Sequence, residues 1–350
     1  MTPMNKKFLF FTISLFTVSL LTISVSFASP AYVRPEKIIM VWDYISGRND
    51  NQKPDQRIHT DGLDVVSPTW FSLKNRAGDI TSMADSGYVL WAHGSGIKVW
   101  AVFENRSDTA MTQSALSGSA RQKKITAQIV SYARQYRLDG INIDFESINR
   151  ETGKNFESFI AGLYAQLKPL NITLSIDLPL SLDLKNEVYD INQIAKNCDY
   201  IVMMAYDQHY LDSGHAGPVA EIGWVKQGIE EILKYVNPDK VILGIPFYTR
   251  IWTESMEGAN YSLTSAMEGM EATRELFRQN TGIRERSAET GQVYAEYKSG
   301  QKRIMAWLED EHSLSLKLDA VNDYELAGMS AWRAGWEWQG IWDLINAYFE

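Results

Sequence analysis

The stretch DGINIDFE, residues 139–146, decides how the rest of the chain is interpreted. Its apolar and polar residues alternate, and a period of two places Asn142, Asp144 and Glu146 on one face of a strand. Helical patterns lie on both sides of the stretch, which favours a parallel strand inside an α/β fold over an edge strand with one wet face. Carboxylates at such a position are costly to bury unless they are paired, and acids of this kind gather at functional sites. The stretch therefore predicts a functional site on a central strand.

Strand and helix patterns alternate along the rest of the chain. Further strand patterns lie at residues 38–44, 63–73, 97–105, 172–179, 200–207, 241–248 and 328–333. Apolar residues at helical spacing mark residues 123–137, 156–167, 221–236 and about 342–348. Eight parallel strands joined by helices predict a (β/α)8 TIM barrel. A chain of 350 residues with 45% hydrophobic content is long enough to fill the core of such a barrel.

The segment between the seventh and eighth predicted strands is longer than one helix requires. Within it, residues 294–297 and 303–307 have strand patterns, and residues 270–278 have a helical pattern. These patterns predict a small α+β insertion over about residues 253–310.

Catalytic residues of a TIM barrel belong at the carboxyl ends of its strands. The candidates at or near those ends are Asp43, Glu104, Asp144, Glu146, Asp177, Asp207 and Trp332.

The first 28 residues have the form of a signal peptide. Lys6 and Lys7 precede an apolar run, and Ser26-Phe27-Ala28 offers a small-x-small cleavage site. An apolar run of this length could also remain as an anchor, but the cleavage site favours removal. We therefore expect a secreted protein whose catalytic barrel covers residues 29–350, and association with a cell wall or spore stays open.

Charge and composition exclude several other classes of function. The net charge of −9 argues against a nucleic-acid partner. The single cysteine, Cys198, cannot form an intrachain disulfide or a cysteine-based metal site. The five histidines lack paired metal-ligand spacing, and there is no phosphate-binding or dinucleotide-binding glycine motif. We expect no metal, no cofactor and no membrane role once the leader is removed, and the oligomeric state is not indicated.

The central stretch resembles the D-G-x-D-x-D-x-E signature of the family 18 glycoside hydrolases, which include chitinases and spore-cortex glucosaminidases. Asp139, Gly140, Asp144 and Glu146 match the signature, and Asn142 replaces the first of its inner aspartates. In the family that position helps to relay charge to the middle aspartate. Residues 204–207 (MAYD) resemble the family's M-x-Y-D motif, and Trp332 matches a tryptophan on the last strand.

This resemblance implies roles for particular residues. Glu146 would be the general acid and base, and Asp144 would orient the sugar's acetamido group, whose carbonyl would receive a hydrogen bond from Tyr206. Asp207 and Trp332 would contact the sugar, and Asp139 and Asn142 are counted with them as substrate-binding residues. The family uses the substrate's own acetamido group as nucleophile, and the seventh predicted strand, VILGIPFY, contains no acid.

The expected partner is a polysaccharide that contains N-acetylglucosamine. Residues 307–310 (WLED), residues 330–333 (SAWR) and Asn142 resemble the spore-cortex branch, which cuts peptidoglycan after N-acetylglucosamine. Members of that branch usually carry LysM repeats, which this sequence lacks, so chitin-type oligomers stay open, as does endo or exo action. A lectin-like family member that binds sugar without cutting it is the alternative, and the presence of Glu146 favours an enzyme.

Overall fold

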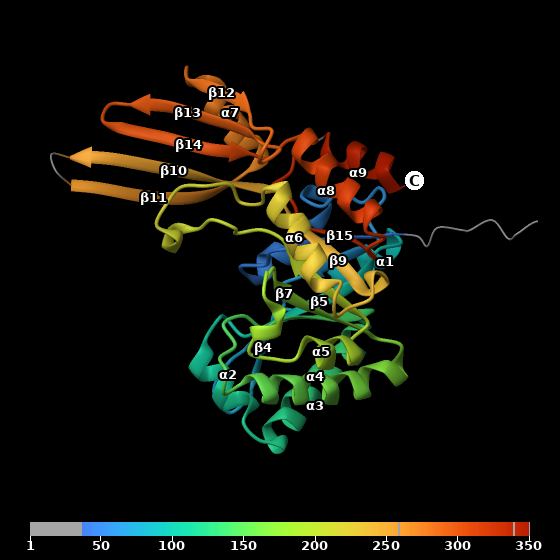
Figure 1. Ribbon diagram of the computed structural model, residues 1–350. Helices are drawn as coiled ribbons and strands as arrows, with labels where there is room; N and C mark the ends of the chain where they lie inside the picture. The colour runs from blue at the N-terminus through green and yellow to red at the C-terminus, as the bar shows by residue number, and fades with distance from the viewer. Residues whose placement is uncertain (1–36, 258–259, 339, 350) are drawn as a thin grey trace, which may run out of the picture. The chain divides into compact units, whose positions relative to one another are not determined.

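The computed structural model describes residues 37–257, 260–338 and 340–349 (Figure 1). The predicted signal peptide, residues 1–28, lies outside these residues. Within the described part of the chain, every helix is too short or too polar to cross a membrane.

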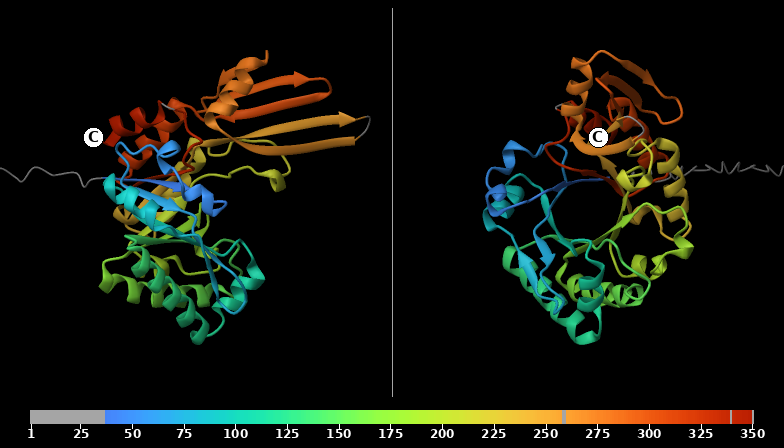
Figure 2. Two further views of the ribbon diagram at one scale, coloured as in Figure 1. Left: turned by 180° about the vertical axis from the view of Figure 1, so that it is seen from behind. Right: turned by 90° about the vertical axis from the view of Figure 1, so that its left-hand side faces the viewer.

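A closed parallel barrel forms the main part of the structure. Its strands are β1 (Ile38–Asp43), β2 (Val65–Pro68), β5 (Lys98–Glu104), β6 (Gly140–Asp144), β7 (Thr173–Pro179), β8 (Tyr200–Met204), β9 (Val241–Pro246) and β15 (Gly328–Trp332). Each strand pairs in parallel with its neighbours, and pairing of β2 with both β1 and β5 closes the ring. The view along the axis in Figure 2, right, shows the strands inside and the helices outside. The predicted TIM barrel is confirmed.

The second predicted strand, residues 63–73, is divided in the structure. Its second half is β3 (Phe71–Leu73), which pairs in an antiparallel manner with β4 (Ile80–Ser82). The first half ends at Pro68, which has no N–H to continue a strand ladder.

Helices cover the outside of the barrel. They are α1 (Ser86–Gly94), α2 (Thr109–Leu116), α3 (Ser119–Tyr136), α4 (Gly153–Leu167), α5 (Ile191–Lys196), α6 (Ile222–Ile232), α8 (Glu311–Asp323) and α9 (Ile341–Phe349). In α3, Ile125, Ile129 and Ala133 recur every four residues and are buried, so one stripe of the helix faces the strands.

Alternation along β6 divides its side chains between two cores. Ile141 and Ile143 point outward to the helices, and Phe145 just beyond them stacks on Phe159 of α4 with ring centroids 5.8 Å apart. The intervening residues point to the barrel axis. There Gly140 is required, because a Cβ at this position would lie 2.5 Å from Cδ1 of Trp100.

The insertion between β9 and β15 is a five-stranded antiparallel sheet with one helix. It contains β10 (Tyr248–Glu257), β11 (Asn260–Gly269), α7 (Met270–Gln279), β12 (Ile283–Arg286), β13 (Val293–Ser299) and β14 (Lys302–Leu308), in the order β11-β10-β14-β13-β12. Phe277 of α7 packs with Ala295, Ile304 and Ala306 on one face of this sheet. The insertion begins at Tyr248, before the predicted Thr253, because the chain passes from β9 into β10 with only Phe247 between them.

Candidate active site

Three carboxyl side chains lie in one row at the carboxyl ends of β5, β6 and β7. The strand register places Glu104 beside Asp144. It also pairs Ile143 with Ile176, so the next pair along the two strands is Asp144 and Asp177. Side chains alternate across a strand, and neighbouring parallel strands are about 4.8 Å apart. The row therefore faces the barrel axis, and sequence separation gives no hint of it.

Asp144 has an unusual environment for a carboxyl group. Its Oδ1 is buried and has no hydrogen-bond partner among the described residues. Burial, reinforced by the nearby charges of Glu146 and Glu104, raises the pKa of Asp144 to about 8. Asp144 is therefore largely protonated in the neutral range, and its unpaired oxygen is free to accept a donor from a bound molecule.

Glu146 follows the strand and is exposed. Its backbone is held from both sides by the side chain of Asn105, which accepts from the Glu146 N–H at 3.1 Å and donates to its carbonyl at 2.7 Å. The hydroxyl of Ser107 donates to Glu146 Oε2 at 2.6 Å. These contacts fix a carboxyl group that solvent can reach, next to Asp144.

Aromatic side chains surround the axis beside these acids. Trp42 of β1 lies edge-on to Tyr206, with ring centroids 6.3 Å apart, and is 6.1 Å from Trp332 at the end of β15. Trp332 also contacts the exposed ring of Tyr44 at 6.3 Å. Burial and the nearby hydroxyl of Tyr248 raise the pKa of Tyr206 well above its usual range, so its hydroxyl is a permanent donor. The structure thus brings Tyr206 and Trp332 to the same end of the barrel as Asp144 and Glu146.

Asp207 joins the barrel to the insertion. Its Oδ1 accepts from the hydroxyl of Tyr248 at 2.8 Å and from Nη2 of Arg250 at 2.9 Å, both in β10. Asp207 lies just after β8 with a φ of 57°, in the left-handed region. The predicted sugar-binding residue is therefore also a brace for the wall that the insertion forms.

Two predicted substrate-binding residues lie elsewhere, and both predictions are corrected. Asp139 precedes β6, at the amino end of the barrel, where it accepts from the Val99 N–H and pairs with His93, each at 2.8 Å. Asn142 does face the axis but has no exposed surface, so it cannot touch a sugar. The sequence motif runs along the whole strand, and only its last residues reach the open end.

Asp43 is also turned away from the site. Its carboxylate is paired with Arg57 at 2.6 and 2.7 Å and accepts from the hydroxyl of Tyr88 at 2.8 Å. Since the preceding residue, Trp42, points to the axis, Asp43 points outward. Trp42, Asn105 and Ser107 were not predicted, because a core tryptophan and two loop residues have no pattern that marks them.

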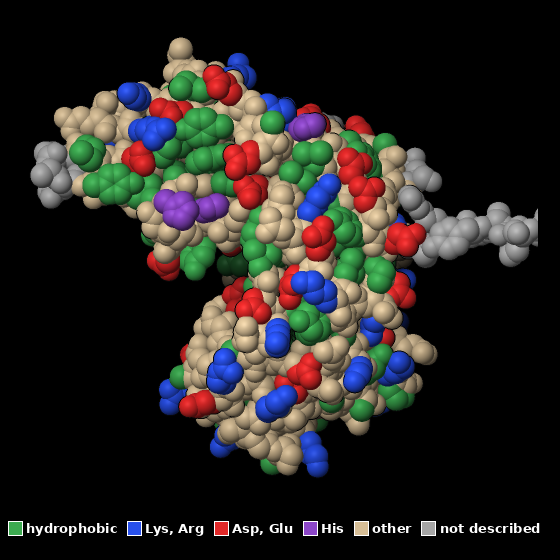
Figure 3. All heavy atoms as spheres, in the orientation of Figure 1, with side chains coloured by type: hydrophobic (Ala, Val, Ile, Leu, Met, Phe, Trp, Pro, Cys, Tyr) green, Lys and Arg blue, Asp and Glu red, His purple; other side chains and the backbone are tan. Residues whose placement is uncertain are grey.

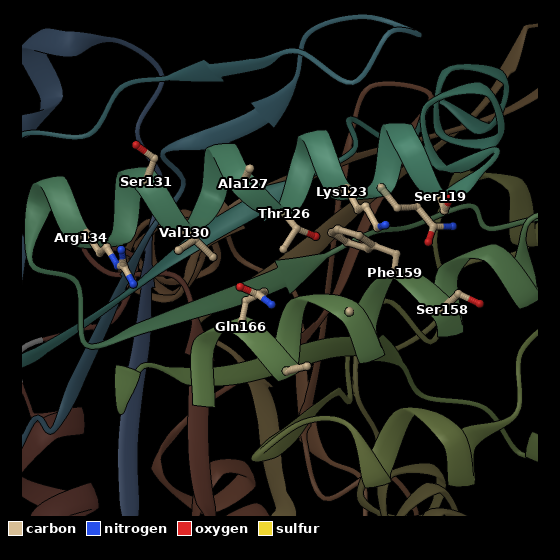
Figure 4. Close-up of a pocket in the computed structure, with 13 residues that line it drawn as sticks. Ser119, Lys123, Thr126, Ala127, Val130, Ser131, Arg134, Ser158, Phe159 and Gln166 are labelled. Atoms are coloured by element: carbon tan, nitrogen blue, oxygen red, sulfur yellow. The ribbon is translucent and has the colours of Figure 1, made fainter. Parts of the chain in front are cut away.

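Two hollows differ in their chemistry. Figure 3 shows the surface hollowed below the hairpin of β10 and β11, with acidic side chains at the edge of the hollow. A second hollow of about 810 Å³ lies between α3 and α4, outside the barrel (Figure 4). Most of its lining residues are small or polar, Phe159, Lys123 and Arg134 also line it, and no carboxyl group does. The second hollow therefore lacks the acids that bond cleavage would use.

Comparison with known proteins identifies the family of the chain. The model of glycosyl hydrolases family 18 matches residues 39–336. The glycosylase YvbX of Bacillus subtilis is 27% identical over 88% of this chain and 90% of its own length. The cortical fragment-lytic enzyme of Bacillus anthracis is 23% identical over 68% of this chain, which spans only 56% of that protein.

A solved structure supports the fold separately. The crystal structure of a chitinase from Chromobacterium violaceum superimposes with a TM-score of 0.79 at 21% identity, over 89% of this chain and 98% of that one. Because the family model spans the barrel from β1 to β15, the chain belongs to the glycosyl hydrolases of family 18.

Proposed function

We propose that this glycoside hydrolase cleaves β-1,4 linkages next to N-acetylglucosamine in peptidoglycan or in chitin-type oligomers, with the substrate's acetamido group as nucleophile. One observation carries the proposal. Asp144 and Glu146 stand together at the open end of the barrel, beside Tyr206 and Trp332, whereas β9 and the residue after it contain no acid.

Glu146 is the residue suited to proton transfer. It is exposed, its backbone is fixed by Asn105, and its carboxyl accepts from Ser107. In the first step the Glu146 carboxylic acid gives its proton to the glycosidic oxygen as the bond from that oxygen to C1 breaks. In the second step the Glu146 carboxylate takes a proton from the water that attacks C1.

The acetamido carbonyl supplies the missing nucleophile. Its oxygen bonds to C1 as the leaving group departs, and the attacking water later breaks that bond and restores the acetamido group. The unpaired Oδ1 of Asp144 is placed to accept the acetamido N–H, and the hydroxyl of Tyr206 donates to the carbonyl oxygen. Two inversions at C1 give overall retention of configuration.

The aromatic residues suit the sugar ring. Trp332 is partly exposed and rests against Trp42 and Tyr44, so its ring is held by packing. An aromatic face held in this way can stack on the apolar face of a pyranose. Asp207, braced by Tyr248 and Arg250, stands beside this position as a polar contact.

The names of the related proteins suggest which polymer is the substrate. The name of one relative, a cortical fragment-lytic enzyme, supports peptidoglycan, and the chitinases among the solved structures support chitin oligomers. Both contain the N-acetylated sugar that the mechanism requires. Digestion of cortex fragments and chitin oligomers side by side, with mass analysis of the products, decides between them.

Replacing the acid tests the assignment. We expect Glu146→Gln to lower kcat by about 10²- to 10⁴-fold, because proton transfer is lost while the cleft keeps its shape. Asp139→Asn, at the other end of the same strand, is the matched control. Retained hydrolysis in the glutamine variant would remove Glu146 as the acid. A wild-type protein that binds these polymers but cuts neither would be a lectin-like member of the family.

An inhibitor tests the nucleophile. A thiazoline analogue of N-acetylglucosamine resembles the cyclic intermediate, so it should inhibit competitively. If an enzyme carboxylate were the nucleophile instead, the thiazoline would not inhibit hydrolysis.

Export is part of the proposal and rests on the sequence of residues 1–28. The protein recovered from culture medium should begin near Ser29. A chain that begins at Met1 in the membrane fraction would instead indicate an uncleaved anchor.

A further inference from the structure

Asn142 occupies the position where the family signature has an aspartate. Asp144 therefore has no carboxyl partner at that position of β6. The amide of Asn142 is already fully used, because its Oδ1 accepts from Trp42 Nε1 at 2.9 Å and from Ser67 Oγ at 3.3 Å. Its Nδ2 donates to Ser175 Oγ at 2.9 Å and to Asp177 Oδ1 at 2.6 Å. No donor of Asn142 is left for Asp144, whose buried Oδ1 has no partner in the described chain.

The neighbouring strand supplies a carboxyl group in its place. Asp177 of β7 is only 2% exposed, and the register of β6 and β7 brings it next to Asp144. Its hydrogen bond from Asn142 fixes its orientation. A carboxyl group this deeply buried cannot touch the sugar, so any part that it plays is exerted through Asp144.

The charges around the pair are acidic or neutral. Glu104 lies on the β5 side, Glu146 above β6, and Tyr206 beyond β8, while Trp42 faces the pair from β1. Arg106, whose charge lowers the pKa of Glu104 against the effect of burial, donates to Ser72. Burial and the charge of Asp144 raise the pKa of Asp177, and the hydrogen bond from Asn142 opposes this. Two adjacent buried carboxyls without a cation keep a proton between them.

We propose that Asp177 is the positioning residue of Asp144, so that the aspartate partner absent at position 142 is supplied by the next strand and the two carboxyls share one proton. This inference rests on the proposed function. In the free enzyme the two carboxyls hold this proton between them. As the acetamido oxygen bonds to C1, the proton moves to Asp177, and the Asp144 carboxylate accepts the acetamido N–H. When water opens the intermediate the proton returns, so none is gained or lost by the pair.

Moving the carboxyl back to its usual strand is the sharpest test. Asp177→Asn should lower kcat by about 100-fold with little change in KM, and should shift the pH profile of kcat. The double variant Asn142→Asp with Asp177→Asn returns a carboxyl partner to β6 and should recover kcat to within about tenfold of wild type. Asp139→Asn is the control for general effects of removing a carboxylate, and thermal melting of each variant reports its folding.

Two results would overturn the inference. One is a wild-type kcat and pH profile in Asp177→Asn, and the other is a double variant no more active than that single variant. If the single variant does not fold, Asp177→Ser, with its smaller polar side chain, takes its place in the same comparison.

Failure of the proposed function is recognised separately, because the wild-type protein would then cut neither polymer. The pair can still be tested by carbon NMR titration of the aspartate carboxyls. Two carboxyls that share a proton titrate as a pair, so Asp177→Asn should shift the titration of Asp144 away from its wild-type course. An unchanged titration of Asp144 would contradict the shared proton whether or not the protein is a glycosidase.

Discussion

The two ends of β6 carry aspartates of the same sequence motif in opposite environments. At the amino end, Asp139 is about one-third exposed and is satisfied by a backbone N–H and by His93. At the carboxyl end, Asp144 has a buried oxygen without a partner and lies among other acids. The first arrangement stabilises the fold, and the second is costly to stability unless it serves a ligand. A shared motif therefore does not mean a shared role.

Substituting each aspartate by asparagine should separate the two roles most clearly. Asp144→Asn should lower kcat on chitin oligomers by about 10²- to 10³-fold, because a fixed group that stabilises the transition state is lost. Asp139→Asn should keep kcat within a few-fold of wild type. Steady-state kinetics of both purified variants makes the comparison, and equal losses would mean that the two ends of β6 are not distinct.

For stability we expect the opposite order, with a larger loss on substitution of Asp139 than on substitution of Asp144. Asp139→Ala removes the hydrogen-bond partner of the Val99 N–H and of the His93 ring, so we expect the free energy of unfolding to fall by about 1–2 kcal/mol. Asp144→Ala removes a carboxyl group whose buried Oδ1 has no partner among the described residues. Urea unfolding monitored by fluorescence measures both, and a larger loss in Asp144→Ala would reverse the assignment of Asp139 as the structural residue.

A further difference is expected in the pH dependence of stability. The pKa of Asp144 is raised from 3.8 to about 8 in the folded protein. Between these values the folded chain holds a proton that the unfolded chain has released, so the free energy of unfolding falls as pH rises through this window. Asp144→Asn removes this linkage, and its Tm should fall less steeply between about pH 5 and pH 8. Part of the slope remains through Asp177, and calorimetry of the wild type and the variant gives both slopes.

The same contrast explains which predictions from the sequence failed. Alternation along residues 139–146 identified the inward face correctly, but it did not say how far along the strand the open end begins. Asn142 shares that face but is buried beneath Trp42, and Asp139 lies before the strand, at the opposite end of the barrel. The depth of a residue along the barrel axis depends on how neighbouring strands are staggered. The sequence of a single strand does not specify this stagger.

The sequence by itself determined the barrel, the insertion between its last two strands, and the position of Asp144 and Glu146 at a strand end. Periodicity of two and of 3.6 residues is a local property, and eight parallel strands joined by helices are the number that a TIM barrel needs. Only the tertiary structure decided which acids meet. Asp43 lies on β1, which is apolar on both faces, so alternation could not tell that it turns outward to Arg57. Asp177 meets Asp144 through a register between strands whose pairing residues are 33 positions apart, as for Asn142 and Ser175. Contacts of that kind depend on how distant segments pack. They therefore cannot be predicted from residues that are neighbours along the chain.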